Sequence, residues 1–273
     1  MADSNDRSPL IDEVTTLSVE TRKPRIFNRI LVYTIFNLVS IPALPIFTIF
    51  RGPSTMLSLW RLARLPAIDY DNTDKKELVQ KALSLPTAQV YLKENALEFQ
   101  ITEGYCSVAT QRNLLKSIPG FSTEKLPCSS KRGGPSTAEE FSSSLSAISG
   151  YRTKVVHGSS EGYEVFRQAL CQSNEPEKYR VAVNFLRSSL MGFGYPVWLP
   201  SNILLAFVGG HFSPVLGYLE EENLVAIFDT NHKYGFYLCD AKRLFDAVNT
   251  VDVTNGSKRG LIIMDLTART NTE

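Results

Sequence analysis

Histidine and cysteine are scarce in this chain, and positive and negative charges are nearly balanced. The 273 residues include three histidines and four cysteines, and the formal net charge is +1. A balanced charge gives no general attraction to a polyanion, so we expect no nucleic-acid partner. The cysteines are far apart and form no C-x-x-C pair, which argues against a zinc knuckle and against a dense disulfide framework. No cluster of metal ligands stands out, so no metal site is expected.

A folded core is indicated by what the chain does contain. Hydrophobic residues make up 43% of the sequence and charged residues 21%, which is typical of a packed globular protein. The length allows one sizeable domain with additions, or two small domains.

The first 28 residues are polar and include Pro9 and Pro24, so we expect a disordered tail. Residues 6–11 (DRSPLI) have the form of an acidic dileucine sorting signal, which favours an endomembrane, vacuolar or lysosomal location. A chance match in a short acidic tail is the alternative.

Charge is absent from residues 30–50, which lie between Arg29 and Arg51. A helix needs about 20 mostly apolar residues to cross a bilayer core, and arginines and aromatic residues suit its borders. Pro42 and Pro45 would kink such a helix, or turn it into a shallow hairpin. We therefore predict a membrane anchor, single-pass or hairpin, with lipid as its partner. The alternative is a buried core helix.

The rest of the chain predicts a mixed α+β domain. Apolar spacing or composition predicts helices over residues 75–85, 107–118 and 242–248. Short runs of β-branched and aromatic residues predict strands near residues 155–156, 182–185, 214–218, 224–228 and 260–264. Residues 127–149, rich in Ser, Gly and Lys, are expected to be a flexible connection.

Cys106 is the strongest candidate for a reactive residue. Gln100 stands six positions before it, and His211 and then Asp229 follow later. This is the chain order of papain-type thiol enzymes: cysteine is the nucleophile, histidine the base, the acid orients the imidazole, and glutamine donates to the oxyanion. The predicted helix begins just after Cys106, and a helix N-terminus stabilises a thiolate. A buried, unreactive cysteine is the alternative.

Several segments together resemble phytochelatin synthase, the glutathione γ-glutamylcysteinyltransferase family. They are residues 99–109 (FQITEGYCSVA), 210–214 (GHFSP), 228–229, 233–234, 247–252 and 256–260. The resemblance covers most of residues 65–266, at the level of a catalytic domain. Together with the polar start and the uncharged run, it predicts a tail at 1–28, a transmembrane or membrane-hairpin segment at 29–51, a linker at 52–64, the catalytic domain at 65–266 and a short tail at 267–273.

The resemblance implies a papain-like fold with a nucleophile on a helix and His and Asp on an antiparallel sheet. It implies cleavage of the Cys–Gly bond of glutathione and transfer of γ-glutamylcysteine to a second glutathione or to water. It implies no tightly bound cofactor; a Cd or Zn ion would enter as a metal–glutathione thiolate substrate. A homodimer is a further expectation. The residues implied to act are Cys106, His211, Asp229 and Gln100 in catalysis, and Arg187, Arg259, Tyr105 and Gly210 in substrate binding.

The chain also departs from the family pattern. Ser107 replaces the glycine that usually follows the nucleophile, and residues between Arg187 and His211 form an apparent insertion. Gly235 and Phe236 replace a proline pair. Two alternatives therefore remain: a papain-type peptidase acting on glutathione conjugates or other peptides, and a membrane-tethered pseudoenzyme.

Overall fold

A computed structural model describes residues 26–69, 75–130, 134–192 and 200–270 of the chain. The predicted sorting signal at 6–11 and nearly all of the predicted tail at 1–28 lie outside these residues.

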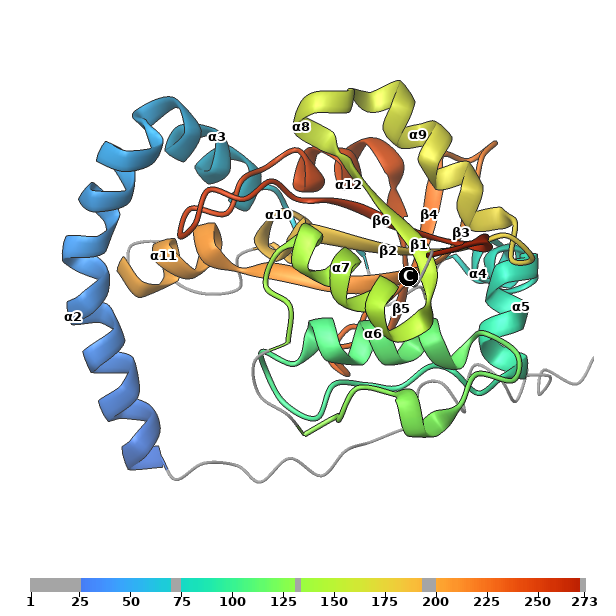
Figure 1. Cartoon of the computed structure of the whole chain (residues 1–273). Coiled ribbons are helices and arrows are strands. Elements are labelled where there is room, and N and C mark those ends of the chain that lie inside the picture. The colour runs from blue at the N-terminus through green and yellow to red at the C-terminus, as the bar shows by residue number, and fades with distance from the viewer. Residues whose placement is uncertain (1–25, 70–74, 131–133, 193–199, 271–273) are drawn as a thin grey trace, which may run out of the picture.

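A six-stranded antiparallel sheet forms the centre of the molecule (Figure 1). Its strands lie in the order β1-β6-β2-β3-β4-β5. All five predicted strands are present, and β5 was not predicted from the sequence. The last strand, β6, extends into the predicted tail at 267–273. The bounds are β1 Tyr151–His157, β2 Tyr179–Leu186, β3 Gly210–Leu219, β4 Leu224–Phe228, β5 Phe236–Asp240 and β6 Gly260–Arg269.

Helices cover both faces of the sheet, because alternate residues of each strand point to opposite faces. Along β2, Val181 and Val183 pack with Phe166 of α9 and Leu244 of α12. Ala182, between them, packs with residues of α6 and α7 instead. Figure 1 shows the same layers, with α9 and α12 on one side of the sheet and α6 and α7 on the other. The predicted α+β class is therefore confirmed.

The described helices run along the chain from α2 to α12. The predicted helices at 75–85, 107–118 and 242–248 are found as α4, α6 and α12. The bounds are α2 Ile26–Arg51, α3 Pro53–Ala63, α4 Lys76–Leu83, α5 Pro86–Lys93, α6 Cys106–Lys116, η1 Thr123–Lys125, α7 Ala138–Ser149, α8 Gly158–Glu161, α9 Tyr163–Cys171, η2 Gln172–Asn174, α10 Arg187–Met191, α11 Pro200–Val208 and α12 Ala241–Val248.

Two segments predicted to be irregular are helical. The proposed flexible connection at 127–149 contains α7, which begins with a capping box: the Glu140 backbone N–H donates to the Thr137 side chain, and the Glu140 carboxylate accepts from the Thr137 backbone N–H. This reciprocal cap satisfies N–H groups that would otherwise have no partner. The proposed linker at 52–64 contains α3, whose Met56 and Leu59 are buried.

The predicted membrane segment forms α2, which packs against the globular domain on one side. Leu44 and Phe47 pack against a buried cluster from α3, α11 and neighbouring segments, and Arg51 Nε donates to the Val253 carbonyl at 3.0 Å. Among the residues that the structure describes, no helix is both long and apolar enough to cross a membrane. The predicted transmembrane segment is therefore not found there.

Candidate active site

Cys106 is the first residue of α6, as the sequence predicted. Gly104, two residues earlier, has φ +88°, a value that glycine adopts without the steric penalty of a Cβ. The turn at this glycine brings the chain into the helix at Tyr105, the N-cap residue. Because the first N–H groups of a helix have no intrahelical partner, Cys106 lies at the positive end of the helix dipole. Its side chain is half-buried and forms no disulfide.

His211 and Asp229 meet across a β-hairpin. His211 lies at the start of β3, and Asp229 directly follows the end of β4. Since these strands pair antiparallel, the beginning of one lies beside the end of the other. His211 Nε2 is 2.7 Å from Asp229 Oδ1, and both side chains are almost completely buried. The predicted base and its orienting acid are therefore in hydrogen-bond contact.

The third member, Cys106, contacts the same histidine. Cys106 lies close enough to the His211 side chain and the Phe212 backbone N–H for both to lower the pKa of its thiol. Since Nε2 is engaged by Asp229, Nδ1 is the ring nitrogen left for the sulfur. The structure thus brings Cys106, His211 and Asp229, which are far apart in sequence, into one relay.

The electrostatics of the relay favour charge separation. Burial by itself would raise the pKa of Cys106, but the attraction and hydrogen bond of His211 and the Phe212 N–H lower the pKa below its ordinary value. Burial opposes charge on His211 as well, yet the attraction of Asp229 and Cys106 raises the pKa of His211 to about 10. These opposite shifts favour a thiolate–imidazolium pair at neutral pH.

Gln100 lies next to the relay and is buried. Its backbone N–H donates to the Thr230 carbonyl at 2.7 Å, which joins the segment before the nucleophile to the turn that follows Asp229. Its side-chain Oε1 has no hydrogen-bond partner among the described residues. The contact with Thr230 brings Gln100 to the loop of Asp229, and its role in catalysis stays a prediction.

Sequence analysis missed a polar link between the segment just before Cys106 and the turn just after Asp229. The Asn231 backbone N–H donates to Asp229 Oδ1 at 2.8 Å, and its side-chain Nδ2 donates to Glu103 Oε1 at 3.1 Å. Glu103 stands three residues before Cys106, so the pair fixes the two loops relative to one another. An Asn two positions after an Asp is a local turn signal, but the contact with Glu103 spans 128 positions and has no signal in a single sequence.

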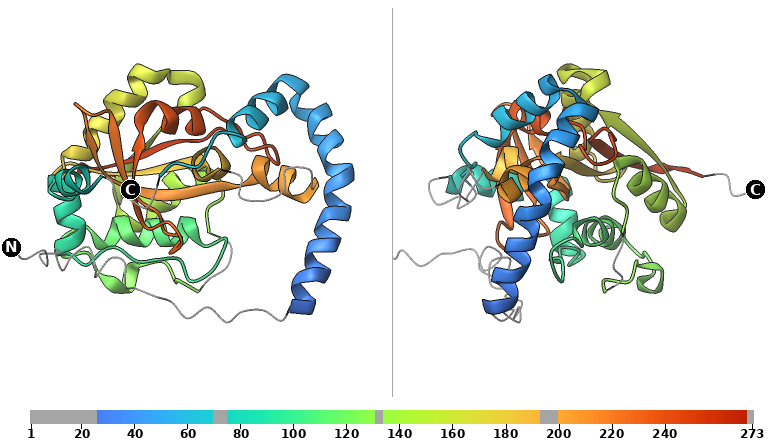
Figure 2. Two further views of the ribbon diagram at one scale, coloured as in Figure 1. Left: turned by 180° about the vertical axis from the view of Figure 1, so that it is seen from behind. Right: turned by 90° about the vertical axis from the view of Figure 1, so that its left-hand side faces the viewer.

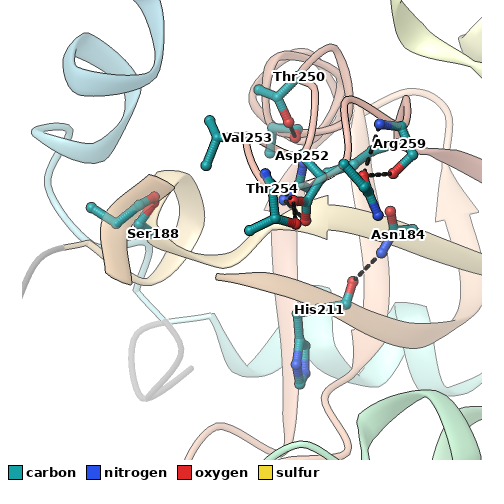
Figure 3. Close-up of polar contacts among 12 residues, drawn as sticks. Asn184, Ser188, His211, Thr250, Asp252, Val253, Thr254 and Arg259 are labelled. Carbon is teal, nitrogen blue, oxygen red and sulfur yellow. Dashed lines mark hydrogen bonds and ion pairs between the residues drawn. The ribbon is translucent and has the colours of Figure 1, made fainter. Parts of the chain in front are cut away.

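The two predicted substrate arginines have different environments. Arg187, at the start of α10, is partly exposed and pairs with Glu103 at 3.2 Å. Arg259 is buried and pairs with Asp252, 3.4 Å from Nη2. Its Nε and Nη1 have no hydrogen-bond partner among the described residues. In Figure 3 the Arg259–Asp252 pair lies on the other side of β3 from the His211 ring.

The remaining predicted substrate contacts adjoin the relay. Tyr105 caps the helix of the nucleophile. Gly210 precedes His211, and a Cβ at this position would lie 3.3 Å from Arg259 Nη2, so a glycine leaves room for the guanidinium. Within the described ranges, no group of three or more His, Cys, Asp or Glu residues is arranged to hold a metal ion.

Comparison with known proteins supports the family resemblance. The family model for phytochelatin synthase matches residues 130–261, which contain His211 and Asp229 and begin after Cys106. A glutathione γ-glutamylcysteinyltransferase 3 of Lotus japonicus is 25% identical over 232 residues, covering 73% of this chain and 42% of the relative. The corresponding enzyme of Schizosaccharomyces pombe is 28% identical over 130 residues, covering 47% and 28%. The chain thus spans less than half the length of these relatives.

Proposed function

We propose that this chain, whose residues 130–261 match the phytochelatin synthase family model, is a thiol transferase acting on glutathione. In this proposal it cleaves the Cys–Gly bond of glutathione and passes γ-glutamylcysteine to a second glutathione, or to water. The observation that carries the proposal is the buried relay of Cys106, His211 and Asp229. Its members touch one another even though the nucleophile lies outside the matched residues.

The first half of the reaction forms a thioester. The Cys106 thiolate attacks the carbonyl carbon of the Cys–Gly bond, and the carbonyl oxygen becomes an oxyanion. The Gln100 side-chain amide, beside the nucleophile, is the donor we assign to this oxyanion. The C–N bond then breaks, and the His211 imidazolium gives its proton to the departing glycine amine. Asp229 keeps the ring oriented and stabilises its charged form.

The second half returns the enzyme to its starting state. The amino group of a second glutathione, or a water molecule, attacks the thioester carbonyl and loses a proton to the neutral His211. The C–S bond breaks and the thiolate leaves, restoring the thiolate–imidazolium pair. Transfer to glutathione lengthens the peptide by one γ-glutamylcysteine unit, whereas transfer to water releases γ-glutamylcysteine. A metal–glutathione thiolate, with Cd or Zn, would enter this reaction as the substrate.

Arg259 is our candidate for holding a carboxylate of glutathione. A buried guanidinium whose Nε and Nη1 have no hydrogen-bond partner among the described residues is costly unless a ligand satisfies these nitrogens. A guanidinium also binds a carboxylate through two parallel hydrogen bonds. Arg187 is a weaker candidate, because Glu103 already neutralises it.

We also propose that the domain has a papain-like fold. The support is the arrangement itself: the nucleophile begins a helix, α6, that packs against β3, the strand of the histidine, and the acid directly follows the adjacent antiparallel strand β4. Fold likeness alone does not establish an activity, so the reaction needs its own test.

The test uses the purified full-length chain with glutathione, with and without CdCl₂. Mass spectrometry follows released glycine, γ-glutamylcysteine and longer peptides. We expect the wild type and Cys128→Ala, which removes an exposed thiol, to release glycine, and Cys106→Ser to release none. Absence of both glycine and longer peptides from the wild type would contradict the proposal and favour a pseudoenzyme. Cleavage of unrelated peptides in preference to glutathione would favour a general peptidase.

A further inference from the structure

The side of α2 that faces away from the domain is almost entirely apolar. Its exposed, described side chains comprise nine apolar residues and one hydroxyl, that of Thr34. Seven of the eleven exposed large hydrophobic residues in the described part of the chain lie on this one helix. Isolated exposed apolar residues are ordinary, but a continuous apolar surface marks a binding face. The nine are Ile35, Leu38, Val39, Ile41, Pro42, Pro45, Ile46, Ile49 and Phe50.

Apart from Thr34, the described polar groups of α2 lie on the inner side or are half-buried. Ser40 is fully buried, Asn37 is half-buried, and Arg51 reaches the Val253 and Thr254 carbonyls. A helix on the surface of a water-soluble domain normally has the reverse arrangement, with its apolar stripe inside and charges outside. The outer face of α2 therefore suits an apolar environment better than water.

The position of α2 leaves this face open. Figures 1 and 2 show the helix along one side of the molecule, outside the layers of the sheet, with α3 and α11 between it and the domain. Among the described residues, the inner side packs on the domain through Leu44 and Phe47 and is joined to it by Arg51.

The charge around this helix identifies the chemistry of its partner. Residues 21–68 contain seven Lys and Arg residues and no Asp or Glu. Removing these seven from the 29 basic and 28 acidic residues of the chain leaves a net charge of −6 for the rest. Arg61 and Arg64 of the α3 region are exposed and form no ion pair with a described residue. Basic residues beside an apolar helix are attracted to the anionic headgroups of a membrane surface.

The prolines of α2 favour a position in the membrane surface. Pro42 and Pro45 lie inside the helix, and each lacks the N–H that would bond the carbonyl four residues earlier. Water and lipid headgroups at the interface can hydrate these free carbonyls, whereas the centre of a bilayer offers no donors.

We propose that α2 binds the surface of anionic membranes, lying in the plane of the headgroups with its outer face in the acyl boundary. The helix stays packed on α3 and α11 while it is bound. The catalytic domain is thereby held against the membrane, and this inference does not depend on the reaction that the domain catalyses.

The experiment measures flotation of the full-length chain with vesicles of 70% phosphatidylcholine and 30% phosphatidylserine. Ile49→Glu and Leu38→Glu alter the two outer positions near the ends of the described face, which are 79% and 64% exposed. Val165→Glu, on α9, makes a matched change at an exposed apolar residue elsewhere. We expect each α2 variant to lower the partition coefficient about tenfold or more, with unchanged Tm, and Val165→Glu to leave it unchanged. Binding should also weaken in pure phosphatidylcholine vesicles and at high salt.

Three results would overturn the proposal. The first is no binding of the wild type to anionic vesicles, or equal binding by Ile49→Glu and Val165→Glu. The second is a lipid-free dimer that Ile49→Glu dissociates, measured by light scattering, because a second copy would then cover the face. The third is resistance of the bound protein to carbonate extraction together with protease-sensitive sites on both sides of the vesicle, because α2 would then span the bilayer.

Discussion

Replacing His211 by Ala should remove the reactivity of Cys106 at mildly acidic pH. In the wild type, His211 is held charged by Asp229 and lowers the pKa of the thiol. A lowered thiol pKa keeps the thiolate present at pH values where an ordinary cysteine is protonated, and the thiolate is lost only as the pH falls through the shifted value. Without the imidazolium, burial and the charge of Asp229 still raise the pKa of Cys106, and the Phe212 backbone N–H is the lowering contact that remains.

The size of the effect follows from the thiolate population. A cysteine with a pKa of ~8.5 is about 0.3% ionised at pH 6, so full ionisation would increase the thiolate by at most a few hundredfold. A more acidic thiol is also a weaker nucleophile, with a Brønsted coefficient of ~0.4–0.5. This reduces the expected gain in alkylation rate to on the order of tenfold.

The assay is iodoacetamide labelling at pH 6, read peptide by peptide by mass spectrometry. Cys128 is exposed and provides the internal reference within the same molecule. Cys239 is buried, which raises its pKa to about 12, so it should label only after unfolding. The reasoning is refuted if Cys106 of the folded wild type labels no faster than Cys128, or if His211→Ala leaves its rate unchanged.

Three further changes test separate parts of the structure. Asp229→Asn should lower kcat by about 10²-fold or more, because the His211 charge loses its partner; a neutral effect in the glycine-release assay would reassign Asp229 to a structural turn. Gln100→Ala should lower kcat by ~10²-fold or more with little change in KM, and an effect confined to KM would argue against an oxyanion role. Thr137→Ala removes the cap of α7 and should lower the free energy of unfolding by about 1 kcal/mol, measured by urea denaturation; unaltered stability would mean that this cap contributes nothing.

The sequence predicted the elements whose signals are local. The helix after Cys106 and the strands around Val183 and Ile227 follow from helical spacing and β-branched runs, and the structure has them. The helix α7 was missed because its serines suggested a flexible segment, although Thr137 and Glu140 form a capping-box pattern that predicts a helix start.

Contacts between segments that are far apart in the sequence were harder to predict. The order of Cys106, His211 and Asp229, together with the motifs that resemble the family, was enough to nominate a relay. The contacts around these residues could not be predicted from the sequence, because they depend on how distant segments pack. They are the contact of Asn231 with Glu103, the ion pair of Arg187 and the burial of Arg259. No helix long and apolar enough to span a membrane is found among the described residues, and hydropathy alone did not reveal that Leu44 and Phe47 pack on the domain.

The packing of α11 against α2 and α3 has a practical consequence for truncation. Helix α11, in the segment that interrupts the family pattern, ends at Val208, three positions before His211. Its Ala206 and Phe207 are buried in the cluster with Met56 and Leu59 of α3. A recombinant form starting near residue 65 would uncover these side chains directly beside the catalytic base. A truncated form should therefore begin before α3, ahead of residue 65, at which the catalytic domain was predicted to begin.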